Sequence, residues 1–492
     1  MKRYFLLLLA ILAMATSCVV ADPGKTPTTS TTADSVSGAE TDAETVVDYL
    51  DTLATDTFDG RTLRIFDAND HPEMHINVAL EESNGDIIND ALYDRDVLME
   101  ETFGIEIEYT LSPGATQAAA SCRKLDNSVW SGDNEWEFVY SCLLGSALST
   151  SATSGTLCNL VDIEALSLDQ VWWSSQLYDT LNLSDIMYFT TGDISPSVYQ
   201  GCNVMFANSR LLNDYQIDDD LLGIALDGAW TLDKLFSLTK DVNRDVNQDN
   251  KLTYQDDIVG INYHSNIGAL LGGTDVRVVL LNEDKDGFDL NFNDTHNVDI
   301  VDKLRQQNFK IENTTGEANE APKRMFMEGR SLFYTHSAEV ALSHFRDMDD
   351  DYVVLPMPKA YEEQESYIST YSGWISSFVA IPKHADVVFA GTMMEAMAYI
   401  GYRDIRPEAY ETVYKVKALR DEDLVRAGKV LDLCFDNVYL DFNSVFDFGG
   451  SNWYPSGAAC GETELISGLE SARGATEKAI AKFVRHWGKS ND

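Results

Sequence analysis

The sequence predicts an α/β fold, because a strand, a helix and a second strand follow one another early in the chain. Residues 63–66 are apolar except for Arg64, which is typical of a short buried strand. Between residues 86 and 103 apolar side chains recur at helical spacing, and Gly104 follows as a natural C-cap. Residues 105–111 alternate apolar and polar side chains, as a strand with one polar face does. Such a strand–helix–strand unit favours parallel strands, so we expect a mixed or parallel sheet flanked by helices.

Later segments repeat this alternation of strands and helices. We expect a third strand at 137–142 and a helix that begins after Thr231 as its N-cap. The same patterns predict short strands and one longer helix further on: strands at 330–334, 352–355 and 377–381, and a helix at 386–402. The sequence has no internal repeat of the solenoid type.

The N-terminus has the pattern of an export signal. Two basic residues precede an apolar run at 5–14 that is too short for an ordinary transmembrane helix. The small residues that follow lead to Cys18, and this segment resembles a bacterial lipobox, whose cysteine is lipidated and becomes the mature N-terminus. Ala15 stands where such motifs usually have leucine, and a plain signal peptide is the alternative. We expect residues 1–18 to be a lipoprotein signal peptide that leaves the protein anchored, through Cys18, to the outer face of the cytoplasmic membrane.

Residues 19–58 are rich in Thr, Ser, Ala and Asp. A segment of this composition buries too little apolar surface to fold by itself, so we predict a flexible tether. A tether behind a lipidated cysteine would hold a folded domain away from the membrane.

The charge balance excludes one class of partner. The chain has 80 acidic and 36 basic residues, a formal net charge of −44. Nucleic acid is therefore not expected, since neutralising its phosphates needs clustered Lys and Arg. The same balance disfavours a polyanionic ligand but leaves room for a local basic pocket.

Six cysteines follow Cys18. An exported chain can hold disulfides, and six is an even number, but spacing does not select a pairing. Reduced, buried thiols are the alternative. The absence of a CxxC pair or a His–Cys cluster in the sequence argues against zinc. The six are Cys122, Cys142, Cys158, Cys202, Cys434 and Cys460.

Several segments, taken in order, resemble extracellular solute-binding proteins of the large bacterial family used for carbohydrate import. Each segment is weak evidence alone, and the ordered set from about residue 61 to about residue 440 carries the resemblance. The segments are ALYDRD at 91–96, EETFGI at 100–105, DGAWTLDKL at 227–235, LPMPK at 355–359, AIPK at 380–383, EAMAYI at 395–400 and YKVKALRD at 414–421.

The resemblance implies a two-lobed, periplasmic-binding-protein-like fold of type II, in which each lobe is a mixed sheet flanked by helices and a hinged cleft lies between them. By analogy, residues 59–200 plus 354–383 form the N-terminal lobe, and residues 201–353 plus 384–492 form the C-terminal lobe. It further implies a monomeric, non-catalytic receptor that captures a sugar and delivers it to the membrane subunits of an ABC permease. The aromatic residues of the candidate cleft favour an oligosaccharide. A peptide, a polyol and a phosphorylated sugar ester are the other ligands left open, and the acidity of the chain disfavours the last. The alternatives are a secreted glycoside-active enzyme and a surface sugar receptor without a transporter. Product formation from a bound sugar distinguishes the enzyme, and neighbouring permease genes distinguish the transporter.

Candidate ligand-binding residues follow from where strands end and from what sugars need. Aromatic rings pack on the apolar faces of sugars, and carboxylates and amides hold their hydroxyl groups. In open sheets such sites lie beyond the carboxyl ends of the strands. Each candidate also has a structural interpretation, such as a turn cap or a core aromatic. The candidates are Asp67, Asn69, Ser141, Asp193, His336, Glu339, Trp374, Trp453 and Tyr454.

A calcium loop is the clearest local motif. Oxygen ligands at positions 1, 3, 5 and 12 and a backbone carbonyl at position 7 match a calcium-binding loop. Position 6 is Asn250 where glycine is usual, and position 12 is Asp256 where the longer glutamate is usual. Because the shorter side chain weakens a bidentate contact, the neighbouring Asp257 is an alternative ligand for position 12. An acidic surface turn is the alternative. We expect a structural Ca²⁺ held by Asp245, Asn247, Asp249, Lys251 and Asp256.

Short catalytic motifs are absent from the sequence. It contains no GxSxG elbow, no HExxH and no GxxxxGK[ST] phosphate loop. Its many carboxylates allow a glycosidase pair, but no pattern singles one out. We therefore expect no catalytic residues.

Overall fold

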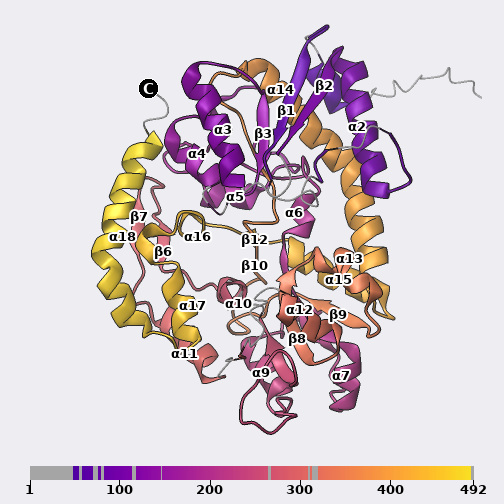
Figure 1. Cartoon of the computed structure of the whole chain (residues 1–492), viewed down its shortest axis with the longest axis vertical. Coiled ribbons are helices and arrows are strands. Elements are labelled where there is room, and N and C mark those ends of the chain that lie inside the picture. The colour runs from indigo at the N-terminus through magenta and orange to yellow at the C-terminus, as the bar shows by residue number, and fades with distance from the viewer. Residues whose placement is uncertain are drawn as a thin grey trace, which may run out of the picture. The chain divides into compact units, whose positions relative to one another are not determined.

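Two four-stranded sheets organise the protein (Figure 1). The computed structural model describes residues 48–54, 58–69, 76–78, 82–112, 118–143, 145, 147–263, 267–307, 311–312 and 320–488. The predicted signal peptide with Cys18, and residues 19–47 and 55–57 of the predicted tether, lie outside these residues. The described part of the predicted tether includes the helix α1 (Tyr49–Leu53), whose Leu50 is buried, so the folded part of the chain begins before the predicted end of the tether.

The first sheet contains the predicted strand–helix–strand unit. β1 (Thr62–Asp67) pairs in parallel with β2 (Glu106–Leu111), and α2 (Ile87–Phe103) connects them. α2 begins at its N-cap Asp86 and ends at Gly104, whose φ of 68° is the left-handed conformation that glycine adopts without strain. This part of the prediction is confirmed.

Two further strands complete the first sheet. β3 (Phe138–Ser141) pairs in parallel with β1, and β11 (Phe378–Ala380) pairs antiparallel with β3, so the order is β11-β3-β1-β2. Both strands were predicted from apolar runs. The sheet is therefore mixed, with one antiparallel edge strand that comes from late in the chain.

The second sheet is also mixed. β4 (Asn203–Asn208) is buried along its whole length and pairs antiparallel with β8 (Ser331–Ser337) and β9 (Tyr352–Leu355). β5 (Val259–Asn262) pairs in parallel with β8 at the edge. β8 and β9 match predicted strands, whereas β4 and β5 were not predicted.

The remaining helices and strands surround and connect the two sheets. Thr231 caps α9 (Leu232–Thr239) and Asp386 caps α14 (Val387–Ile400), as predicted. The other elements are α1 (Tyr49–Leu53), α3 (Ala118–Ser131), α4 (Leu148–Ser154), α5 (Ser175–Thr180), α6 (Ser197–Gln200), α7 (Ser209–Asp214), α8 (Leu221–Leu226), α10 (Ile267–Gly273), β6 (Val279–Leu281), β7 (Phe288–Leu290), α11 (Thr295–Gln306), α12 (Glu320–Met327), α13 (Val340–Ser343), β10 (Ser369–Thr370), α15 (Leu424–Phe435), β12 (Val438–Tyr439), α16 (Phe442–Phe446), α17 (Trp453–Ala459) and α18 (Leu465–Trp487), with 3-10 turns at Leu160–Asp162, Phe345–Asp347 and Phe448–Gly450.

α14 packs on the first sheet. Its Phe389 and Met393 belong to the same buried cluster as Leu63 of β1. The predicted boundaries assign residues 384–492 to the second lobe, whereas the packing partners of α14 lie in the first sheet. The boundaries as a whole stay a prediction.

Two π-helical stretches, Gly401–Ile405 and Pro407–Ala418, extend α14 towards the second sheet. The carbonyl of Ala418, the last residue of the second stretch, accepts a hydrogen bond from the Tyr352 hydroxyl of β9 at 2.7 Å. Tyr410 packs edge-on against Phe435 of α15, with 5.4 Å between ring centroids. One continuous helical run therefore connects the two sheets, and π-helical turns of this length are rare.

The C-terminal end of α18 contacts a segment that pairs with β11 of the first sheet. The Trp487 indole donates to the carbonyl of Ile186 at 3.2 Å, and the Tyr188 hydroxyl donates to the Trp487 carbonyl at 2.5 Å. The segment that carries these two partners bridges β11 through Thr190. Earlier along its length α18 runs beside α17 and α11 (Figure 1).

All six cysteines among the described residues carry free thiols. Burial raises the pKa of Cys122 and of Cys202 to about 12, so both thiols stay protonated at neutral pH. Of the two options that the sequence leaves open, the structure has the reduced, mostly buried thiols. None of the described helices is both long enough and apolar enough to cross a membrane.

Candidate functional site

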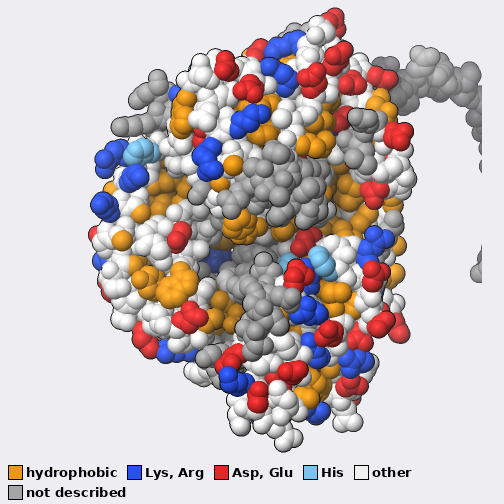
Figure 2. Space-filling model, in the orientation of Figure 1, with side chains coloured by type: hydrophobic (Ala, Val, Ile, Leu, Met, Phe, Trp, Pro, Cys, Tyr) orange, Lys and Arg blue, Asp and Glu red, His pale blue; other side chains and the backbone are white. Residues whose placement is uncertain are grey.

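A cavity of about 840 Å³ lies between the two sheets. Leu143, which follows β3, and Ile375, which precedes β11, line it from the first sheet, and Ser337 of β8 lines it from the second. Figure 2 shows a hollow in this region, with hydrophobic, basic, acidic and histidine side chains around it. The volume lies in the upper part of the ~300–1,000 Å³ range of small-molecule sites, and a lining from two sheets suits a small solute.

Trp374 is an aromatic residue in the lining of this cavity. Its side chain is 48% exposed, although large aromatics are usually buried. The ring lies against the backbone of Gly145, where an added Cβ would stand 2.8 Å from it. Tyr371, which is buried, lines the same cavity. An exposed ring held in place from behind is a suitable surface for the apolar face of a sugar.

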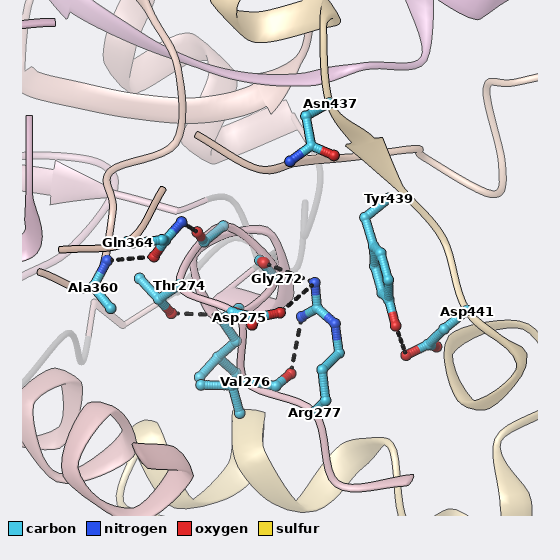
Figure 3. A network of polar contacts seen from close by, with 12 residues as sticks. Gly272, Thr274, Asp275, Val276, Arg277, Ala360, Gln364, Asn437, Tyr439 and Asp441 are labelled. Carbon is cyan, nitrogen blue, oxygen red and sulfur yellow. Dashed lines mark hydrogen bonds and ion pairs between the residues drawn. The ribbon is translucent and has the colours of Figure 1, made fainter. Parts of the chain in front are cut away.

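Arg277 and Tyr439 form a second wall of the cavity (Figure 3). The guanidinium carbon of Arg277 lies 3.7 Å from the centre of the Tyr439 ring, which is a cation–π contact. Two of its nitrogens donate to the carbonyls of Val276 and Gly272, at 3.0 and 3.1 Å. These bonds fix the plane of the guanidinium group.

The Tyr439 hydroxyl completes this wall. It donates to the Asp441 carboxylate at 3.0 Å. Burial raises the pKa of Tyr439 above its ordinary value, so the hydroxyl remains a donor at neutral pH. Asp441 in turn accepts the backbone N–H of Ser444 at 2.7 Å and caps α16.

Charged and histidine side chains form a third wall. Glu339 lies 3.5 Å from the Nδ1 atom of His336, and burial raises the pKa of Glu339 to about 8. The Lys323 ammonium lies 3.1 Å from Glu320 and 2.9 Å from His344 Nε2. The residues of this wall that line the cavity are Glu320, Lys323, His336 and Glu339. Burial lowers the pKa of His344, and the positive charge of Lys323 lowers it further, which favours the neutral form of the imidazole.

Three of the predicted ligand-binding residues, His336, Glu339 and Trp374, line the cavity. Trp453 and Tyr454 belong to α17, whose Pro455 and Ser456 line it, but their rings lie against Gly457 and Gly468 instead. The other four candidates are buried outside the lining, namely Asp67, Asn69, Ser141 and Asp193.

Asp67 and Asn69 belong to a buried polar network beside the segments that cross between the sheets. The Asn69 amide donates to Asp67 at 2.8 Å and to the Ser377 hydroxyl at 2.9 Å. The backbone N–H of Ser377 donates to the Ser197 hydroxyl at 2.7 Å, and the Ser195 hydroxyl donates to Asn77. The network joins the end of β1 to the segment before β4 and to the segment before β11.

Asp193 lies on the first crossing segment. It accepts a hydrogen bond from the Tyr199 hydroxyl at 2.5 Å and lies 3.5 Å from Arg406 of the π-helical run. Burial raises its pKa to about 6. These contacts tie the crossing segment to the helical run that connects the sheets. Ser141, at the end of β3, contacts the Cys122 thiol at 3.4 Å.

Several lining residues were missed from the sequence. Arg277 is a lone charge in an apolar run at 276–279, and this is the one local signal that it faces a special environment. Lys323, Tyr371, Tyr439 and Asp441 stand in no motif, because the tertiary structure alone brings them to one cavity.

The predicted calcium loop has several features of such a site. Asn250 has a φ of 65°, the left-handed conformation that position 6 requires, and Asp245 accepts its backbone N–H at 2.7 Å. Asp249 accepts the N–H of Lys251 at 2.9 Å. Asp256 is exposed, whereas Asp257 is buried and accepts the N–H groups of Val246 and Thr253.

The donor set of this loop suits a hard cation that prefers oxygen ligands. The described residues contain no group of three His, Cys, Asp or Glu side chains close enough to hold a metal ion. Two of the predicted ligands, the side chain of Asn247 and the backbone carbonyl of Lys251, are not among these four side-chain types. The calcium site stays a prediction.

Solved structures with this fold span nearly the whole chain. An ABC substrate-binding protein from Listeria monocytogenes in complex with cycloalternan is 12% identical, with a TM-score of 0.53 over 86% of this chain and 100% of its own. The galacto-N-biose-/lacto-N-biose I-binding protein of the ABC transporter from Bifidobacterium longum is 13% identical, with a TM-score of 0.54 over 87% and 99%. A cyclo/maltodextrin-binding protein complexed with maltotetraose is 12% identical, with a TM-score of 0.56 over 86% and 97%.

These likenesses establish the fold. The chain has the two-lobed architecture of solute-binding proteins, and the predicted fold class is confirmed. No family model and no curated protein matches the sequence.

Proposed function

We propose that this protein is the extracellular substrate-binding component of an ABC importer, which captures a carbohydrate in the cavity between its lobes and delivers it to a membrane permease. The observation that carries this proposal is the cavity of about 840 Å³, whose lining combines the exposed Trp374 with polar side chains such as Ser337 and His336 of β8. Aromatic faces opposite hydrogen-bonding groups are the combination that sugars require.

The fold supports the same function. The three similar structures carry cycloalternan, lacto-N-biose and maltotetraose, and their names describe binding proteins rather than enzymes. The volume of the cavity favours an oligosaccharide over a single sugar ring. On this proposal the protein is a monomer that binds its ligand reversibly and leaves it chemically unchanged.

Export and anchoring complete the proposal. The predicted signal peptide and lipobox place the protein outside the cell, held by a lipid on Cys18. The tether that follows would let the receptor reach permease subunits in the same membrane.

The test is calorimetric titration with a panel of mono- and oligosaccharides, together with an assay for products. We expect one or more oligosaccharides to bind reversibly without being consumed. The Trp374→Ala variant is expected to lose at least about tenfold in affinity, since it removes a ring face that stacks on the sugar.

Trp130→Ala is the matched control. Trp130 is 64% exposed on α3 and does not line the cavity. Its loss is expected to leave the affinity unchanged. Consumption of the bound sugar would show an enzyme, and equal affinities of the two variants would show that the cavity is not the binding site.

We also propose a structural Ca²⁺ in the loop at 245–257, with Asp257 in place of the exposed Asp256 as the last ligand. Calcium that binds only the folded protein raises its melting temperature. We expect a rise of a few degrees on addition of calcium chloride to EDTA-treated protein, and none for Asp245→Ala. Asp284→Ala, at an exposed acidic residue of another turn, is the control and should keep the response. A wild-type melting temperature that ignores calcium contradicts the proposal.

A further inference from the structure

The deepest charges in the lining of the cavity are positive. Lys323 is 7% exposed and Arg277 is 8% exposed, in a chain whose net charge is −44. Burying an ammonium group is unfavourable unless it is paired with a negative charge. The carboxylate partner of Lys323 is Glu320, whose side chain is 62% exposed, and its other partner, His344, tends to be neutral. Neither of these two partners is a buried anion that balances the charge of Lys323.

Glu339 does not provide this counter-charge at neutral pH. Burial raises its pKa to about 8, even though Lys323 and the Ser337 hydroxyl act in the opposite direction. One carboxyl oxygen lies within reach of Ser337 and His336, both at 3.5 Å. The other oxygen, Oε2, is buried and has no hydrogen-bond partner in the described part of the chain. When uncharged, the carboxyl group of Glu339 carries an O–H donor, and its side chain lines the cavity and is 20% exposed.

The groups that face Glu339 come from three elements. Lys323 belongs to α12, and β8 carries Tyr334, His336 and Ser337. The π-helical run contributes Tyr414, whose buried hydroxyl also lacks a partner among the described residues.

The remaining carboxylate of the lining has its own partners. Asp441 accepts the Tyr439 hydroxyl and the Ser444 N–H, so it does not neutralise Lys323. Among its described residues, the lining therefore holds buried cationic and donor groups without a matching buried anion. This is the local basic pocket that an acidic chain still allows.

We propose that the captured saccharide carries a carboxylate, as an oligosaccharide of uronic acids does, and that Lys323 and Glu339 receive this group. The inference rests on the proposed function and names its class of ligand. A ligand carboxylate supplies the missing counter-charge to Lys323 and accepts the Glu339 proton donor in a charge-assisted hydrogen bond. Ionised Glu339 would repel the same group.

The test is calorimetric titration with trisaccharides of galacturonic, glucuronic, mannuronic and guluronic acid, each against its neutral counterpart, at pH 7 and pH 9. At pH 7 one uronate trisaccharide is expected to bind at least about tenfold more tightly than its neutral counterpart. Glu339 loses its proton as the pH rises through about 8, so this preference should fall by about tenfold or more at pH 9. His344, whose pKa is lowered, stays neutral over this range.

Three variants separate the contributions. Lys323→Met is expected to lose at least about tenfold in affinity for the uronate and little for neutral sugars, whereas Lys323→Arg should keep the preference. Glu339→Gln should still bind at pH 7, because an amide also donates, and its affinity should no longer change between pH 7 and pH 9. Thermal unfolding of each variant checks that it is folded.

Two results would overturn the inference. If a neutral sugar binds as tightly as its uronate, the ligand is not acidic. If Lys323→Met keeps the uronate preference, Lys323 does not receive the carboxylate. In either case the receptor function stands. If no saccharide of either kind binds, the proposed function fails and this inference fails with it.

Discussion

The Gly401→Ala variant is expected to be less stable than the wild type by about 2 kcal/mol or more, although alanine favours helices over glycine by about 1 kcal/mol. A Cβ at Gly401 would lie 1.9 Å from the carbonyl oxygen of Asp193 and 2.7 Å from its carbonyl carbon. These are backbone atoms, so relief requires movement of the segment that crosses between the sheets. Urea denaturation measures the difference in the free energy of unfolding.

Gly474→Ala is the matched control for this prediction. Gly474 lies in the middle of α18, is exposed and has no atom within 4 Å of the position of an added Cβ. This variant is expected to be unchanged or more stable by up to about 1 kcal/mol. Equal free energies of unfolding for the two variants would show that the π-helical stretch Gly401–Ile405 and the crossing segment do not approach this closely.

The Glu395→Ala variant is expected to be destabilised by about 3–5 kcal/mol, because it leaves several buried donors without an acceptor. The carboxylate of Glu395 is fully buried in α14. It accepts the indole N–H groups of Trp172 and Trp173, at 3.1 and 2.8 Å. It also accepts the Tyr49 hydroxyl at 3.1 Å and the backbone N–H of Ser167 at 3.2 Å.

These bonds attach α1, the first described helix, and the segment at 167–173 to α14. Glu395→Gln keeps one acceptor oxygen but turns a donor towards the other donors, so we expect about half of the alanine effect. The control is Glu408→Ala, at an exposed position of the same helical run, which should change the free energy of unfolding by less than about 0.5 kcal/mol. A loss below about 1 kcal/mol for Glu395→Ala would contradict the assigned network.

Local patterns were sufficient for much of the secondary structure. The α2 helix was predicted because its apolar spacing, its N-cap Asp86 and its C-cap Gly104 all act within a few residues of one another. α3 was missed because its sequence, AAASCRKLDNSVWS, places polar residues such as Ser121 and Asp126 on its buried face. Those positions are buried because other elements cover them, which no local pattern records.

The candidate site was predicted less completely for a related reason. The rule that ligands lie beyond the ends of strands selected Glu339 and His336, which line the cavity, and Asp67, which is buried in a network between the sheets. A residue at the end of a strand either faces the cavity or supports it, and the packing of the other elements decides which. The same packing brings Arg277 and Tyr439 together from distant parts of the chain.

The sequence alone determined the alternation of strands and helices, the α/β class and, through its ordered resemblance, the two-lobed fold. The alternation and the class follow from spacing and capping between near neighbours, where a few residues decide the backbone conformation, whereas the two-lobed fold was implied by the resemblance alone. The tertiary structure decided which side chains share the cavity, which carboxyl groups are buried and therefore hold their protons, and which glycines must stay glycines. Those properties depend on atoms that residues far apart in the sequence bring within a few ångströms of one another.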